Sequence, residues 1–285
     1  MLRPQRVLAI HDMSGVGRCS LTVIIPALSC MGHQVCPVPT AMLSTHLGGF
    51  GEVAARDLTD YMPSAYEHYK SLGLDFECIY TGFLSSQSQI DSCLKFFEGF
   101  PDALKVVDPV MGDNGRLYVD AKVAGRMKEL VLKADVIVPN LTEAQILLGD
   151  RVDLSPMSHE DAKRLLSRLS EMGPKMVCIT GVSLFGGPNY ANLVYDRDKG
   201  LFYLVPYDYM PVAYPGTGDL FASVLTGGLL WGESIPMAAS RATTFCTSCI
   251  KTTYTYKSDT REGVFLEKNL SMLTDRSIFS SFQLL

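Results

Sequence analysis

The sequence predicts an α/β fold: a doubly wound, mostly parallel sheet with helices on both faces and an antiparallel hairpin at one edge. Short runs rich in Val, Ile and Leu recur without strict polar alternation, which is typical of strands buried on both faces. Longer helical patterns separate these runs, and such alternation of strand and helix implies a parallel sheet. After Gly181, two extended runs joined by the polar turn Arg197–Gly200 predict the hairpin.

The expected elements follow one another in a simple order along the chain. Parallel strands are expected at Arg6–His11, Gln34–Thr40, Glu77–Thr81, Leu104–Asp108, Asp135–Pro139 and Lys175–Thr180, and hairpin strands at Tyr190–Asp196 and Leu201–Tyr207. Helices are expected at Arg18–Met31, Asp60–Leu72, Gln87–Phe97, Ala121–Lys133, Ser158–Met172, Gly218–Leu230 and Ile235–Thr252. Since no repeat, low-complexity segment or linker interrupts this series, we expect residues 1–285 to form a single domain.

The composition argues against several kinds of partner and location. The chain has 285 residues, a formal net charge of -5 and no run of Lys or Arg, so neither nucleic acid nor an anionic membrane is an expected partner. The best candidate for a membrane span, Leu220–Trp231, is broken by Thr226, Gly227 and Gly228 and is shorter than the ~18 residues that a span needs. The 8 Cys are scattered through apolar segments and no secretion signal is evident, so we expect a reducing, cytoplasmic location.

Polar and glycine-rich segments directly follow several of the expected strands. They are His11–Gly15, Asp108–Asp113, Asn140–Glu143 and Thr180–Gly181. In open α/β sheets, ligands bind outside the carboxyl ends of the strands. The sequence therefore predicts that these segments line one crevice.

The segment Pro215–Ser223 is the strongest indication of chemistry. Gly216 and Gly218 allow the backbone to approach an anion, and the free N–H groups at the start of the following helix can bind it. Asp219 is expected in the first helical turn, where it could accept a proton from a substrate hydroxyl during phosphoryl transfer. An acidic residue that only complements the helix dipole is the alternative interpretation.

Asp108 and Glu143 are candidate ligands for Mg²⁺. This ion is commonly bound by one or two carboxylates together with phosphate oxygens and water. Asn140 and Glu143 also have the spacing of a helix N-cap and its partner, so a purely structural role is the alternative for both.

Other common catalytic motifs are incomplete or missing from the sequence. The glycines at 15 and 17 follow a strand, but the third glycine of a dinucleotide-binding fingerprint is replaced by Ser20. The chain has neither a GxxxxGK[ST] phosphate-binding loop nor a GxSxG nucleophile elbow. A nicotinamide-dependent enzyme, a P-loop kinase and an acyl hydrolase are therefore disfavoured.

Taken together, the segments resemble those of the pyridoxal (pyridoxamine) kinases of the ribokinase-like superfamily over almost the whole chain. The segments that carry the resemblance are Ser14–Gly17, Ser44–His46, Tyr80–Phe83, Asp108–Asp113, Pro139–Glu143, Thr180–Gly181 and Gly216–Asp219. The resemblance implies an ATP-dependent, Mg²⁺-dependent kinase that phosphorylates the 5′-hydroxyl of pyridoxal or a related B6 vitamer, giving pyridoxal 5′-phosphate and ADP. It also implies a homodimer.

The resemblance further implies roles for individual residues. Asp219 takes the position of the catalytic base, and Gly216, Thr217 and Gly218 take that of the anion hole. On the vitamer side, Ser14 matches a residue that bonds the pyridine ring, and Thr45, His46 and Phe83 lie over the same pocket. The residues matching nucleotide-binding positions are Asp113, Asn140, Glu143, Thr180 and Gly181, and those matching metal-binding positions are Asp108 and Glu143.

Two alternatives to a B6 kinase stay open at this point. A hydroxymethylpyrimidine kinase would act on a ring of similar size, and a non-catalytic vitamer-binding protein could keep the same fold. The chain carries apolar Leu47 and Phe83 where relatives of this kind can carry polar residues, so we expect weak discrimination among vitamers; Val138 likewise replaces a polar residue, beside the nucleotide.

Overall fold

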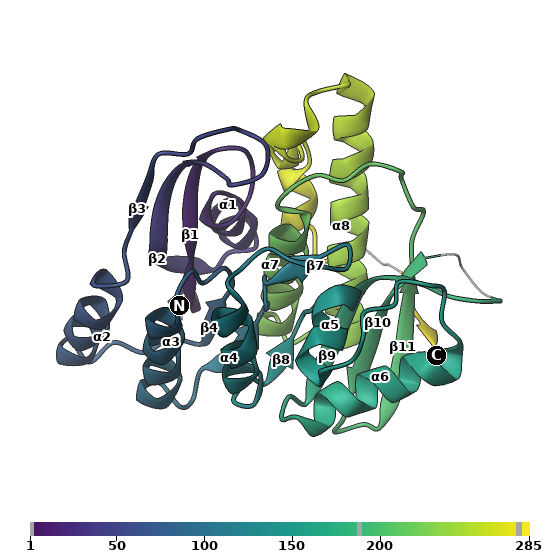
Figure 1. The fold of residues 1–285 in the computed structure, drawn as a ribbon, viewed down its shortest axis with the longest axis horizontal. Coiled ribbons are helices and arrows are strands. Elements are labelled where there is room, and N and C mark those ends of the chain that lie inside the picture. The colour runs from purple at the N-terminus through teal and green to yellow at the C-terminus, as the bar shows by residue number, and fades with distance from the viewer. Residues whose placement is uncertain (1–2, 187–189, 278–280) are drawn as a thin grey trace.

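The computed structural model describes residues 3–186, 190–277 and 281–285. One mixed sheet of ten strands runs through the molecule in the order β12-β11-β10-β9-β8-β5-β4-β1-β2-β3 (Figure 1). Its strands are β1 Arg6–Val16, β2 Gln34–Thr45, β3 Ala55–Asp57, β4 Cys78–Thr81, β5 Leu104–Val107, β8 Val136–Ile137, β9 Met176–Ser183, β10 Tyr190–Asp196, β11 Leu201–Pro206 and β12 Gln283–Leu284. The six strands from β2 to β9 in this order pair in parallel, and the strands beyond them pair antiparallel.

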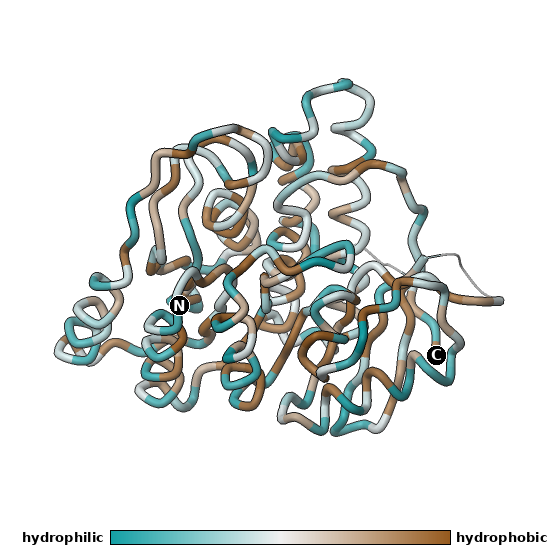
Figure 2. Tube along the Cα trace, in the orientation of Figure 1, coloured by the Kyte–Doolittle hydropathy of each residue, from teal (hydrophilic) through white to brown (hydrophobic). Residues whose placement is uncertain are grey.

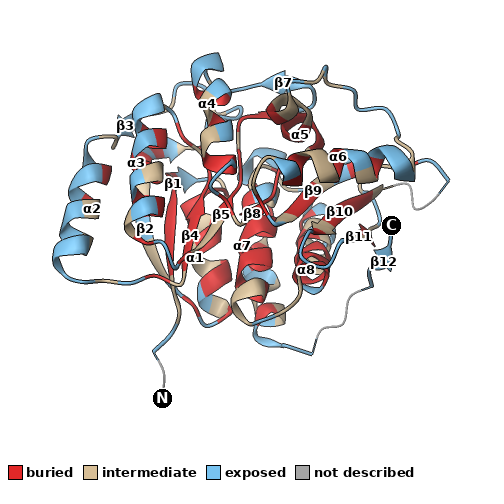
Figure 3. Ribbon diagram, turned by 90° about the horizontal axis from the view of Figure 1, so that it is seen from below, coloured by how far each residue is buried: buried red, intermediate tan, exposed pale blue. Residues whose placement is uncertain are grey.

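Helices cover both faces of the sheet, as the sequence predicts (Figure 3). One face packs against α2 Tyr61–Ser71, α3 Gln87–Gly99, α4 Ala121–Val131, α5 Leu141–Leu148 and α6 His159–Glu171. The other packs against α1 Leu21–Cys30, α7 Thr217–Leu230 and α8 Ile235–Tyr256. Hydrophobic stretches accordingly follow the central strands and the inner sides of these helices (Figure 2). The α/β, doubly wound fold with an antiparallel hairpin of β10 and β11 is therefore confirmed.

Three strands extend past the ends expected from the sequence: β1, β2 and β9, the last of which continues past Thr180 to Ser183. β1 continues past His11 to Val16, and β2 continues past Thr40 to Thr45. Beyond Ile10 strand β1 no longer pairs with β4, so this part pairs only with β2, which in turn pairs with the short β3. The register of β1 and β2 shifts between His11 and Met13, and such irregularities re-aim side chains next to binding sites. The ends expected at His11 and Thr40 are therefore wrong, because pairing within this extension continues both strands.

Several short elements were not expected from the sequence. Strands β6 Gly112–Asp113 and β7 Arg116–Leu117 form a separate hairpin, with Asn114 (φ 49) and Gly115 (φ 79) at its turn. Helix α5 was anticipated only as a possible N-cap at Asn140. In the described residues after α8, three 3-10 helices precede β12: η1 Thr260–Glu262, η2 Leu266–Lys268 and η3 Leu270–Thr274. Among the described residues, no helix is both long and apolar enough to cross a membrane.

Candidate active site

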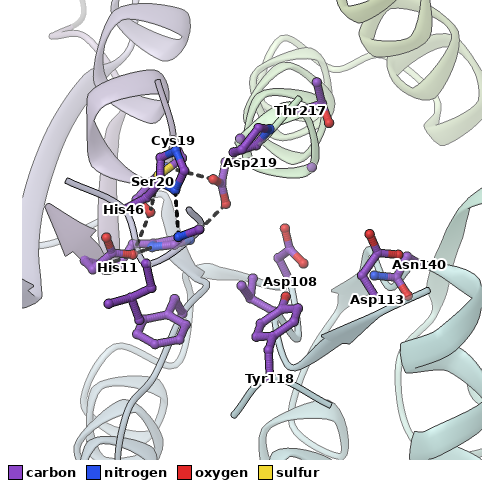
Figure 4. A pocket seen from close by; sticks show the side chains of 18 of the residues that line it. His11, Cys19, Ser20, His46, Asp108, Asp113, Tyr118, Asn140, Thr217 and Asp219 are labelled. Carbon is purple, nitrogen blue, oxygen red and sulfur yellow. Dashed lines mark hydrogen bonds and ion pairs between the residues drawn. The ribbon is translucent and has the colours of Figure 1, made fainter. Parts of the chain in front are cut away.

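A cavity of about 480 Å³ opens where the parallel strands end and α7 begins (Figure 4). It collects most of the residues that the sequence singled out: His46, Phe83, Asp108, Asp113, Asn140, Glu143, Thr180, Gly216, Thr217, Gly218 and Asp219. Three others, Ser14, Thr45 and Gly181, are not among the lining residues. The strand-end segments predicted to line one crevice therefore do meet there, although not through every residue named.

The first turn of α7 forms one wall of the cavity. Its N-terminal N–H groups have no partners within the helix, because the first turn precedes any i−4 carbonyl. Gly216 caps the helix at φ 77, and a Cβ there would lie 2.0 Å from the Arg18 carbonyl oxygen. Gly218, in contrast, has no positive φ, and its added Cβ would meet nothing within 4 Å. The left-handed glycine is therefore Gly216, and the open space beside Gly218 faces the cavity.

The carboxylate of Asp219 is fixed by contacts from β1 and from the start of α1. Its Oδ2 accepts a hydrogen bond from the Ser20 N–H at 2.7 Å, and its Oδ1 lies 3.0 Å from His11 Nε2. Ser20 presents this N–H from the N-cap of α1, where its backbone has an unusual positive φ of 58. Asp219 is 8% exposed, so its carboxylate is held at the cavity surface.

Sequence reasoning did not assign a role to His11, Asp12 or Ser20. Asp12 Oδ1 accepts a hydrogen bond from Ser20 Oγ at 2.6 Å and lies 2.8 Å from His11 Nδ1. Ser14 Oγ donates to Asp12 Oδ2 at 2.8 Å, so the Ser14 hydroxyl is turned toward Asp12. The sequence did show a His11-Asp12 pair directly after the first expected strand. It could not show that His11 bonds Asp219, because the two residues are 208 positions apart.

Asp108 stands between these groups and the opposite side of the cavity, as Figure 4 shows. It is 6% exposed, and burial together with the nearby carboxylates of Glu143 and Asp219 raises its pKa well above the ordinary value. A cation would relieve this crowding of negative charge. In the described part of the chain, however, no three acidic, His or Cys side chains are grouped closely enough to hold a metal by themselves.

Glu143 fastens the β6–β7 hairpin to the start of α5. Its Oε1 accepts hydrogen bonds from the N–H groups of Met111 at 2.8 Å and Gly112 at 3.4 Å, and its Oε2 accepts one from Asn140 at 3.0 Å. Asn140 completes a capping box and also donates its Nδ2 to the Gly112 carbonyl at 2.8 Å. Burial is the main cause that raises the pKa of Glu143, to about 7. Asn140 and Glu143 therefore do form the helix cap that was the alternative interpretation of their spacing, and both residues also line the cavity.

One stretch of the cavity wall is mostly apolar. Leu43, Leu47 and Phe83 line it together with His46. His46 Nε2 donates to the Arg261 carbonyl at 2.6 Å, and its Nδ1 accepts from the Gly48 N–H at 3.0 Å. Both nitrogens of the His46 imidazole therefore have partners in neighbouring loops, and the residue lines the cavity mainly with its ring carbons.

Comparison with known proteins identifies the family. The phosphomethylpyrimidine kinase family matches residues 9–263. A protein of Bacteroides thetaiotaomicron, assigned as a phosphomethylpyrimidine kinase and solved with pyridoxal, is 44% identical with a TM-score of 0.94, over 99% of this chain and 100% of that one.

Two pyridoxal kinases are also similar to the chain. The crystal structure of the Lactobacillus plantarum enzyme is 30% identical with a TM-score of 0.86, over 94% of this chain and 96% of that one. The Arabidopsis thaliana enzyme is 28% identical over 86% of this chain and 80% of its own length. The chain therefore belongs to the phosphomethylpyrimidine kinase family and is a kinase of the pyridoxal kinase type with the ribokinase-like fold.

Proposed function

We propose that Asp219 is the general base of this kinase and that the first turn of α7 binds the phosphoryl group being transferred. The overall reaction is the ATP-dependent phosphorylation of a B6 vitamer, giving pyridoxal 5′-phosphate and ADP when the vitamer is pyridoxal. The observation that carries the proposal is the carboxylate of Asp219, which lines the cavity beside the N–H groups of Thr217 and Gly218.

Each group has a defined task in this reaction. The 5′-hydroxyl oxygen attacks the γ-phosphorus of ATP, its proton moves to Asp219, and ADP leaves with the electrons of the broken P–O bond. The N–H groups of Thr217 and Gly218 bind oxygens of the phosphoryl group, where the helix dipole also favours negative charge. Positioning and electrostatic stabilisation of this kind supply most of the catalysis in phosphoryl transfer.

The acidic residues around the cavity fit a divalent cation that arrives with ATP. Asp108 is the proposed protein ligand, since its buried carboxylate is crowded by other negative charges. Glu143 lies nearby, but its oxygens already accept main-chain hydrogen bonds, so we assign it chiefly to holding the β6–β7 hairpin. When bound, Mg²⁺ would neutralise charge on the phosphate oxygens.

The vitamer is proposed to lie against the apolar wall formed by Leu43, Leu47 and Phe83, with its 5′-hydroxyl toward Asp219. The nucleotide is proposed to lie toward Asp113, Asn140 and Thr180, which line the opposite side. Few polar side chains face the vitamer ring in this arrangement. We therefore expect similar activity on pyridoxal, pyridoxine and pyridoxamine.

Hydroxymethylpyrimidine is the second candidate substrate, because the matching family is named after phosphomethylpyrimidine. An ADP-release assay with the three B6 vitamers and hydroxymethylpyrimidine, followed by competition kinetics, separates the two. We expect kcat/KM to be higher for at least one B6 vitamer. A higher kcat/KM for hydroxymethylpyrimidine than for every vitamer would overturn the substrate assignment and leave the kinase assignment in place.

Three further properties stay predictions. We expect a homodimer, a cytoplasmic location and a single domain over residues 1–285, the first from the family resemblance and the others from the sequence. Sedimentation of the purified protein tests the first directly.

A further inference from the structure

The side chains of Asp12, His11 and Asp219 form a hydrogen-bonded series that links the candidate base to the first strand. His11 Nε2 lies 3.0 Å from Asp219 Oδ1, and His11 Nδ1 lies 2.8 Å from Asp12 Oδ1. Asp12 is in turn held by the hydroxyls of Ser14 at 2.8 Å and Ser20 at 2.6 Å. Figure 4 shows His11, Ser20 and Asp219 gathered on one side of the cavity.

The ring of His11 is confined by its surroundings. Its side chain is 1% exposed, and it packs directly against Gly82 after β4. A Cβ at Gly82 would lie 1.9 Å from His11 Cδ2, so the ring can occupy this position only beside a glycine. The side chain therefore has one well-defined orientation, with both nitrogens directed at carboxylates.

The charge balance of the cavity gives this histidine a particular importance. Among the described residues that line it, Asp12, Asp108, Asp113, Glu143 and Asp219 are acidic and none is Lys or Arg. Burial lowers the pKa of His11, but the charge of Asp219 and the hydrogen bonds to Asp12 and Asp219 outweigh burial and raise this pKa to about 10. Two further titratable groups lie nearby. Asp108 interacts electrostatically with His11, and Cys19 lies close to the carboxylates of Asp12 and Asp219.

We propose that His11 is a positioning residue for the phosphoryl transfer: the Asp12–His11–Asp219 chain fixes the orientation of the base and supplies the protein's own positive charge beside it. His11 stays protonated throughout, since the proton from the substrate hydroxyl goes to Asp219. This proposal rests on the assignment of Asp219 as the base. It adds to that assignment a residue from the opposite end of the chain.

Four variants test the proposal by kinetics. His11→Ala removes the contact, and His11→Gln retains a neutral donor. Gly82→Ala displaces the ring without changing the imidazole itself. The matched control is His33→Gln, because His33 is also buried, 5% exposed, but bonds only the Gly227 carbonyl, outside the cavity.

We expect His11→Ala and Gly82→Ala to lower kcat by about 10²-fold, the usual cost of a small misplacement of a catalytic group, with KM for ATP within about threefold. His11→Gln should lose only roughly 10-fold, because a neutral hydrogen bond is about half as strong as a charge-assisted one. A kcat of His11→Ala within about threefold of the His33→Gln control would overturn the proposal. So would a loss that tracks the unfolded fraction measured by circular dichroism at the assay temperature.

A second measurement does not depend on turnover. In ¹⁵N-histidine-labelled protein at pH 8, the resonances absent from His11→Gln belong to His11, and we expect both ring nitrogens to be protonated. Nδ1 also lies 2.9 Å from the Asp12 N–H, and a neutral ring accepting that hydrogen bond would contradict the proposal. If the wild type phosphorylates no vitamer, the proposed function fails, whereas the resonances still decide whether the charged chain exists.

Discussion

The two sides of the cavity differ in how their functional groups are made. On the α7 side, the groups are main-chain N–H donors at the start of a helix, capped by a left-handed glycine. On the side of the β1–β2 extension, they are side chains that bond one another, such as Ser20 to Asp12 and His11 to Asp12.

This difference decides how far a sequence can predict each side. A main-chain site needs only a strand or loop, glycines and a helix start, all of which are local in the sequence. A side-chain site depends on which partners the fold supplies. We therefore expect substitutions on the α7 side to act on the transfer step, and substitutions on the other side to act through neighbouring residues.

The largest effect is expected on the α7 side, from Gly218→Val. The added side chain meets no protein atom within 4 Å at its Cβ, so the fold should persist, but it enters the space where the phosphoryl group must lie. Turnover should fall below detection, by at least about 10³-fold. The control is Gly216→Val, whose Cβ would clash with the Arg18 carbonyl and which should unfold the protein. Normal activity of Gly218→Val would show that the first turn of α7 does not bind the phosphoryl group.

A smaller effect is expected at Asp108, between the two sides. Asp108→Asn should raise the Mg²⁺ concentration for half-maximal rate by roughly 10-fold, because a charged ligand becomes neutral. The same variant should melt at a higher temperature without metal, since burial and neighbouring carboxylates disfavour the charged form of Asp108. Full wild-type activity in excess chelator, or an unchanged Mg²⁺ requirement in Asp108→Asn, would contradict this role.

On the side of the β1–β2 extension, the charge of His11 should make the free energy of unfolding depend on pH. The pKa of His11 is raised from 6.5 to about 10, so the folded state binds its proton more tightly than the unfolded state. This stabilisation is fully present below pH 6.5 and is lost as the pH rises through about 10. Urea unfolding should therefore give a free energy that falls over this interval, more steeply for wild type than for His11→Gln. Parallel curves for the two proteins would show that His11 is not charged.

The smallest effect is expected from Ser14→Ala. The family resemblance implies a bond from Ser14 to the pyridine ring, which predicts a KM for pyridoxal about 10-fold higher when the hydroxyl is lost. In the structure, that hydroxyl donates to Asp12 and does not line the cavity. We therefore expect KM for pyridoxal to change by less than about threefold. A 10-fold rise with unchanged KM for ATP would restore the direct contact.

Much of the fold was predictable because its strands and helices carry strong periodic patterns. The ends of β1 and β2 were not, since their last residues pair only within the three-stranded extension and include exposed positions such as Val16. The turn at Asn114 and Gly115 has a local signal, but the contact that holds the β6–β7 hairpin to Asn140 and the positive φ of Val110, 40°, do not. A β-branched residue rarely adopts such a conformation.

The candidate site was predictable to a similar extent. Gly216–Asp219 was recognisable because its glycines and its acidic residue lie together at the start of a helix. Asp108 was recognisable because it directly follows a strand and precedes a glycine-containing loop. The link between His11 and Asp219 could not be inferred, because it joins β1 to α7 across most of the chain. Both Gly216 and Gly218 were expected to let the backbone approach an anion, but the left-handed φ of 77 belongs to Gly216 alone of the two, because Gly218 lies within α7.

The most direct test of the central claim is the turnover of Asp219→Asn. Asparagine retains the size and the acceptor oxygen of the side chain but cannot take the proton, so ATP and pyridoxal should still bind in a calorimetric titration. We expect kcat to fall by about 10²- to 10⁴-fold, the usual contribution of a positioned general base. A kcat close to that of the wild type, in a variant that binds both substrates, would contradict the assignment of Asp219 as the base.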